Sequence, residues 1–114
     1  MLIPTPSRIL LSRTPADFRK SIDGLAALVE LHLGESPLSG TMFLFRNARG
    51  NGLKLLFWSS GGFVLVYKKL ERGCFRVPTN GGDRQTLTPA EVAAILEGID
   101  LSKPKRLSRW EQNV

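Results

Sequence analysis

The amino-acid sequence predicts an α+β fold, an antiparallel β meander of four to five strands with two amphipathic helices packed on one face. Two stretches, one toward each end of the chain, repeat apolar residues at helical spacing. Between them lie aromatic and β-branched segments separated by short glycine-containing turns, which is typical of strands joined by hairpins. We expect a single domain over residues 1–101 and a basic, flexible C-terminal tail over residues 102–114.

The two predicted helices begin with nearly the same four residues. Thr14-Pro15-Ala16-Asp17 opens the first helix, and Thr88-Pro89-Ala90-Glu91 opens the second. In each, threonine can cap the helix, proline fits the first helical position, and the acid faces the positive end of the helix dipole. The apolar stripes that follow predict helices over residues 15–33 and 89–98, and Gly34 ends the first.

The middle of the chain predicts the strands. Aromatic and branched residues indicate strands over Met42–Arg46, Leu53–Trp58 and Phe63–Leu70, a weaker fourth over Cys74–Val77, and an N-terminal strand over Ile9–Arg13. Short turns join the middle strands, so we expect an antiparallel meander there. Residues 78–84 are expected to form a loop.

Strand alternation then predicts which residues share a face of the sheet. If the hairpin loops are even in length, one face carries Phe43, Phe45, Lys54, Leu56, Trp58, Phe63, Leu65, Tyr67, Lys69 and Arg76. The more aliphatic face, which we expect both helices to cover, carries Leu53, Leu55, Phe57, Val64, Val66, Leu70, Phe75 and Val77. The first face has the composition of a stacking and phosphate-binding platform. The alternative is that the rings are part of the core and the lysines extend to solvent from the sheet margin. Aromatic residues on sheets are more often packed in this way.

The net charge of +6 is concentrated in one segment. Residues 40–84 hold eight basic residues against two acids, whereas the flanking segments are balanced. A basic patch in a folded domain favours a polyanionic partner, although a merely solubilising surface is an equal alternative on charge alone. The cations and rings that we select as candidate nucleic-acid contacts are Arg46, Arg49, Lys54, Lys69, Arg72 and Arg76, with Trp58 and Tyr67 as stacking groups.

Nothing in the sequence indicates catalysis. The ten acids are scattered, the one histidine (His32) has no partner motif, and there is no phosphate-binding loop or zinc spacing. Cys74 lies near Arg72 and Arg76 but lacks an evident base. We therefore expect no enzyme activity, no cofactor and no metal. The sequence shows no signal peptide or membrane span, which favours the cytoplasm.

Several motifs, in order, carry a resemblance to a known family. They are Phe18–Val29 (FRKSIDGLAALV), Phe43–Asn47 (FLFRN), Lys54–Trp58 (KLLFW), Tyr67–Gly73 (YKKLERG) and Leu96–Asp100 (LEGID). Together they resemble the TnpB-type accessory protein of the sixty-six family of bacterial insertion sequences, over roughly residues 8–101. The chain departs from that pattern at Val66 and Val77, where relatives often have tryptophan, and at Ser59, where aspartate is common.

The resemblance implies a non-catalytic role in transposition beside a separate, larger transposase. It places Arg46, Asn47, Arg49 and Gly50 in the first hairpin, Lys54 and Trp58 on the second strand, and Tyr67, Lys68, Lys69 and Glu71 on the third. It supplies no catalytic residues. The predicted function is an accessory protein that binds the DNA of insertion-element ends through a basic sheet surface. The alternative is a protein-interaction adaptor that docks on the transposase or pairs with itself.

Overall fold

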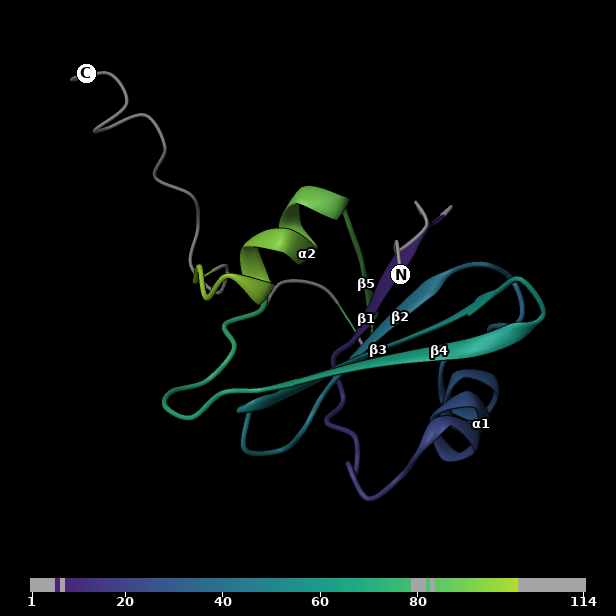
Figure 1. The fold of residues 1–114 in the computed structure, drawn as a ribbon, viewed down its shortest axis with the longest axis horizontal. Coiled ribbons are helices and arrows are strands. Elements are labelled where there is room, and N and C mark those ends of the chain that lie inside the picture. Colours follow the sequence, from purple (N-terminus) through teal and green to yellow (C-terminus); the bar gives the residue numbers. More distant parts are fainter. Residues whose placement is uncertain (1–5, 7, 79–81, 83, 101–114) are drawn as a thin grey trace.

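A computed structural model describes residues 6, 8–78, 82 and 84–100 (Figure 1). The expected C-terminal tail, residues 102–114, lies outside the described residues. The described elements, in chain order, are β1 (Ile9–Ser12), α1 (Ile22–His32), β2 (Met42–Arg46), β3 (Gly52–Ser59), β4 (Gly62–Lys69), β5 (Arg84–Leu87) and α2 (Pro89–Leu96). No helix within these ranges combines the length and the hydropathy needed to cross a bilayer.

The five strands form one mixed sheet in the order β4-β3-β2-β1-β5. The α+β class is confirmed, but the expectation of a purely antiparallel meander is wrong, because β1 pairs with β2 in parallel. All other neighbours are antiparallel. Parallel neighbours cannot be joined by a tight turn, so the chain crosses over from β1 to β2 through α1.

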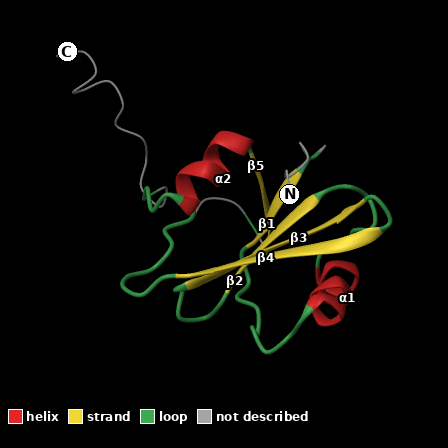
Figure 2. Cartoon of the chain, in the orientation of Figure 1, coloured by secondary structure: helices red, strands yellow, loops and turns green. Residues whose placement is uncertain are grey.

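The two helices lie on opposite faces of the sheet, not on one face as expected (Figure 2). On one face, Leu25 and Val29 of α1 pack with a buried cluster whose sheet residues are Leu10, Phe43, Phe45 and Leu56. On the other face, Val92 and Ile95 of α2 pack with a cluster that includes Ile9, Leu11, Met42, Leu44, Leu53, Leu55 and Phe57. Both sides of the central strands are apolar, so each side needs its own helix.

The alternation expected for the central strands is confirmed. Lys54, Leu56 and Trp58 of β3 stand opposite Tyr67, Leu65 and Phe63 of β4. The loop between β3 and β4 has an even number of residues, because only Ser60 and Gly61 connect Ser59 to Gly62. The φ angles of these two residues are 51° and 82°. Positive φ at both positions is the geometry of the tight turn that suits strand twist.

The fourth predicted strand, Cys74–Val77, is not a strand. Phe75 and Val77 are buried on the α2 side, but the backbone of Phe75 bonds to a loop rather than to a strand. Its N–H donates to the Gly50 carbonyl (2.7 Å), and its carbonyl accepts from Arg46 Nη1 (2.9 Å). The fifth strand is instead β5, which pairs with β1. Its sequence, RQTL, has too few apolar residues to predict a strand.

The two helix starts that look alike in sequence differ in the structure. α2 begins as predicted, with Thr88 and Glu91 forming a reciprocal capping box, and it ends at Leu96. α1 begins at Ile22 after Ser21, so the expected start at Thr14 is wrong. The preceding segment runs along the sheet instead, and Ala16 N–H donates to the Arg46 carbonyl (2.9 Å).

This difference predicts unequal effects of the same substitution. Thr88→Ala removes a side-chain oxygen that accepts from Glu91 N–H, so we expect the free energy of unfolding to fall by about 1 kcal/mol. Thr14→Ala is the matched control and should change it by less than about 0.5 kcal/mol. Urea denaturation measures both. Equal losses at the two positions would contradict the assigned helix starts.

Candidate nucleic-acid interface

Lys54, a predicted phosphate contact, is buried in the structure. Its side chain, from β3, is 6% exposed, and Nζ donates to the carbonyls of Phe18 (3.1 Å) and Lys20 (3.0 Å). Nζ also lies 4.8 Å and 5.0 Å from the ring centroids of Phe18 and Tyr67. Lys54 therefore ties the segment before α1 to the sheet. Because its donors already point inward, this position does not favour the expected phosphate contact, and Lys54 is not among the cations that we propose for DNA.

The aromatic residues of the same face are also used in packing. Phe43 and Phe45 are fully buried beneath α1. Trp58 is half-buried, edge to face with Phe63 at 5.0 Å, and Tyr67 is 50% exposed, edge to face with Phe18 at 5.6 Å. Most of the face predicted as a stacking platform is therefore used in packing, as the alternative interpretation had it, while Tyr67 stays half-exposed.

Two loops lie side by side at one end of the sheet. The β2–β3 loop, residues 47–51, meets residues 70–76 through backbone bonds from Leu70 N–H to the Asn51 carbonyl (2.8 Å) and from Phe75 N–H to the Gly50 carbonyl (2.7 Å). The Cys74 thiol donates to the Arg49 carbonyl at 3.3 Å. These contacts hold together two segments that are about twenty residues apart in sequence. The path of both segments, beyond the end of β4, can be followed in Figure 1.

Four exposed cations lie on these loops or directly beside them. We call this surface the basic end and define it by Arg49, Lys69, Arg72 and Arg76. None of the four side chains makes a hydrogen bond or an ion pair with another described residue. Arg49 and Lys69 line a shallow hollow of about 650 Å³ together with Asn51, Leu70 and Glu71. The basic end therefore presents unpaired positive charge to solvent.

The other four mid-chain cations are used inside the molecule. Arg46 and Lys54 donate to backbone carbonyls, as described above. Lys68 Nζ donates to the Leu96 carbonyl (2.6 Å) at the end of α2. Arg84 donates to the Leu33 carbonyl and pairs with Glu35 (3.2 Å), which also pairs with Arg8. The structure thus separates the predicted phosphate contacts into one exposed group, Arg49, Lys69, Arg72 and Arg76, and two anchoring residues, Arg46 and Lys54.

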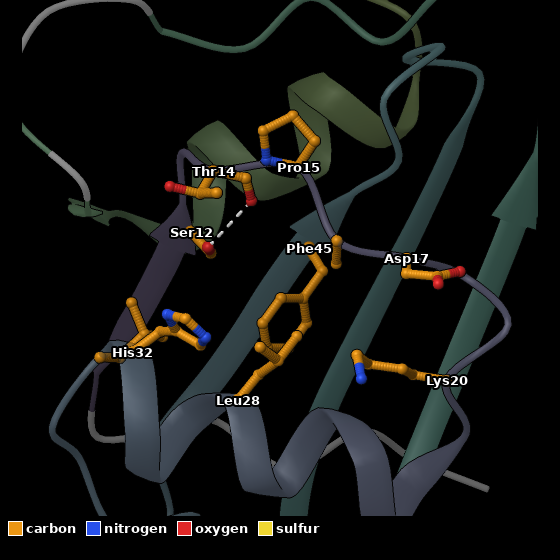
Figure 3. A pocket seen from close by; sticks show the side chains of 10 residues that line it. Ser12, Thr14, Pro15, Asp17, Lys20, Leu28, His32 and Phe45 are labelled. Carbon is orange, nitrogen blue, oxygen red and sulfur yellow. Dashed lines mark hydrogen bonds between the residues drawn. The ribbon is translucent and has the colours of Figure 1, made fainter.

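A smaller hollow lies on the α1 side of the sheet (Figure 3). Its volume is about 230 Å³, and its lining includes Thr14, Pro15, Leu28, His32 and Phe45. Figure 3 shows His32 and Lys20 on separate parts of its wall. Within the described part of the chain, no three His, Cys, Asp or Glu side chains gather as a metal site would require.

Fold and site together define a class: a small α+β protein with a group of exposed, unpaired cations at one end of its sheet. Comparison with known proteins supplies the family. The family model described as IS66 Orf2 like protein matches residues 7–106, and the chain belongs to this family of insertion-sequence accessory proteins. The resemblance identified from the sequence motifs is confirmed.

Two relatives from Sinorhizobium fredii are similar over most of their length. The protein y4jC is 34% identical over 99 residues, which is 87% of this chain and 85% of y4jC. The protein y4hO is 35% identical over 103 residues, which is 90% of this chain and 89% of y4hO. Both relatives are uncharacterized. No solved structure matches the chain.

The anchoring role of Lys54 predicts a loss of stability on substitution. Lys54→Met keeps much of the apolar stem but removes two hydrogen bonds from a charged donor, so we expect unfolding free energy to fall by about 2 kcal/mol. Lys69→Met removes an exposed, unpaired ammonium and serves as the control, with a change below about 0.5 kcal/mol. Chemical denaturation followed by tryptophan fluorescence reports both. Indistinguishable midpoints for the two variants would refute the anchoring role.

The Asp17 carboxylate is expected to titrate at unusually low pH. Hydrogen bonds from the Arg19 side chain and backbone N–H hold the pKa of Asp17 at about 2, below its ordinary value of 3.8. The ion pair therefore favours the folded state above pH 3.8, and this contribution disappears as the pH falls toward 2. NMR titration of the Asp17 carboxyl carbon measures the midpoint, and Arg19→Gln should raise it toward 3.8. A wild-type midpoint already near 3.8 would exclude the pair.

Proposed function

We propose that this protein is a non-catalytic accessory factor of insertion-sequence transposition that binds DNA through its basic end. The observation that carries the proposal is the grouping of four cations on two adjoining loops and at the end of β4: Arg49, Lys69, Arg72 and Arg76. None of the four side chains has a partner among the described residues. Phosphates would supply the missing partners, and their binding would release condensed counterions.

The position of the aromatic residues favours contact with the phosphate backbone over stacking on bases. Single-strand binding proteins present rows of exposed rings beside their cations. Here Phe43 and Phe45 lie beneath α1, and Trp58 stands near the opposite end of β3 from the loop at residues 47–51. Tyr67 is exposed near the basic end, but it is a single ring and not a row. We therefore propose duplex DNA as the ligand. Backbone contacts orient a protein on a duplex but carry little sequence information.

The described acids support a role without phosphoryl transfer. Such chemistry uses clustered carboxylates that hold divalent metal ions. Asp17 is paired with Arg19, Glu35 with Arg8 and Arg84, and Glu91 belongs to the capping box of α2. Each of these acids has a structural partner at a different place in the fold. We propose that a separate transposase in the bacterial cytoplasm supplies the chemistry and that this protein assists it on DNA.

A protein-interaction adaptor is the second candidate function, and the outer edge of the sheet at β4 favours it. An edge strand offers backbone hydrogen-bonding groups to a partner chain. Retention on an immobilised transposase, with no retention on DNA alone, would support the adaptor over direct DNA binding.

The salt dependence of binding tests the DNA proposal. Four phosphate contacts predict that log K falls with log salt at a slope of about −3.6 on duplex DNA. Arg49→Gln should reduce the magnitude of that slope by about 0.9, because one contact is lost. Fluorescence anisotropy of a labelled duplex at several salt concentrations measures it.

Lys20→Gln is the matched control for that titration. Lys20 is an exposed cation outside the basic end, and its substitution should leave the slope unchanged. A DNA affinity that is insensitive to salt would contradict the proposal. So would an equal effect of Lys20→Gln and Arg49→Gln, since the positive charge would then act without a defined site.

A further inference from the structure

β4 is an edge strand with unused hydrogen-bonding groups. Leu70 N–H donates to the Asn51 carbonyl, and β4 pairs with β3 in antiparallel register. Because bonded and outward-facing residues alternate, the backbone groups of Phe63, Leu65, Tyr67 and Lys69 point away from β3. No other described strand pairs with this edge.

The side chains of β4 leave apolar surface at the same edge. Phe63 and Leu65 pack partly against the α1-side cluster, and Val64 and Val66 pack partly against the α2-side cluster. All four are only half-buried. Native edge strands are usually protected by charges or prolines. In β4 the charges are Lys68 and Lys69, both at its C-terminal end, so the remainder of the edge is unprotected.

We propose that a second copy of this chain pairs with β4, antiparallel, about a two-fold axis through Leu65. Only residues whose backbone groups face outward can exchange hydrogen bonds. Leu65 faces outward and lies near the middle of β4, so in this register it stands opposite Leu65 of the second copy. In this register Phe63 stands opposite Tyr67, and Val64 opposite Val66. Aromatic and β-branched pairs of this kind stabilise sheets. The two five-stranded sheets become one continuous sheet, and the half-buried side chains are covered on both faces.

The distribution of charge argues for a second copy as the occupant. In the register centred on Leu65, Lys68 and Lys69 stand opposite Gly62 and Gly61 of the second copy. The two Lys69 residues are then about 27 Å apart at ~3.4 Å per residue, well beyond the screening length of ~8 Å at physiological salt. A shift that centres the axis on Val66 would place both lysines opposite Val64 and Phe63. The charges on β4 therefore favour the register centred on Leu65 over the one centred on Val66.

The dimer would also change how the protein meets DNA. This further point rests on the proposed function, whereas the dimer itself does not. The two-fold axis places the basic ends at opposite ends of the β4 pair, separated by about 27 Å or more. Successive turns of duplex DNA repeat at ~34 Å, and symmetric dimers commonly contact half-sites at that spacing. A dimer could thus contact two neighbouring turns of the duplex.

Disulfide trapping of the full-length protein tests the dimer in the absence of DNA. In a Cys74→Ser background, Leu65→Cys places two thiols opposite each other across the axis, where Cα atoms ~5.5 Å apart permit a disulfide. Tyr67→Cys is the matched control. It lies on the same strand and is more exposed, but its partner copy stands about 14 Å away. We expect Leu65→Cys to form a disulfide-linked dimer at least ten times faster than Tyr67→Cys.

Equal rates of linkage at the two positions, or none at Leu65→Cys, would overturn the proposed register. Sedimentation equilibrium of the Cys74→Ser protein measures the mass of the assembly with the sequence of β4 unchanged. A concentration-dependent shift to twice the monomer mass supports the dimer, and a monomer at all concentrations up to ~1 mM overturns it. Arg49→Gln should leave that mass unchanged even where it weakens DNA binding, so failure of the dimer and failure of the DNA proposal are distinguishable.

Discussion

The parallel pairing of β1 with β2 is the constraint on which the rest of this structure depends. Parallel neighbours require a crossover connection, and the crossover here contains α1. The helix has an apolar stripe that must be covered, so it packs on the sheet face that carries Phe43, Phe45 and Leu56. The opposite face is covered by α2. Because both faces become core, the loops and the sheet edge remain as surfaces for partners.

The mid-chain cations are divided between contacts inside the fold and the surface of the basic end. Arg46, Lys54, Lys68 and Arg84 each donate to a backbone carbonyl in a segment far away in sequence. In this way they fasten the loop at Phe75, the approach to α1, and the ends of both helices. The side chains of the basic end make no such hydrogen bond within the described chain. Some of the basic residues that raise the pI of this small protein thus have internal roles. Only the remaining basic residues are available to bind a polyanion.

Local patterns predicted a good part of this fold, whereas long-range pairing was beyond them. The capping box at Thr88 and the alternation along β3 and β4 were readable because turn length and capping chemistry are local. The β1–β2 pairing was not readable, since no residue near Ile9 indicates its neighbour. β5 was missed because backbone pairing with β1, not apolar alternation, defines it. Lys54 looked exposed because a lysine on a strand usually is, and the carbonyls that receive its Nζ lie more than thirty residues away.

We propose that DNA meets the loops of the basic end and not a face of the sheet. Amide and indole NMR shifts recorded during titration with a short duplex test this claim residue by residue. The account predicts perturbations confined to residues 48–51 and 69–76, with the Trp58 indole and α1 unmoved. Perturbations centred on Trp58, Tyr67 and α1, with the basic end silent, would contradict it.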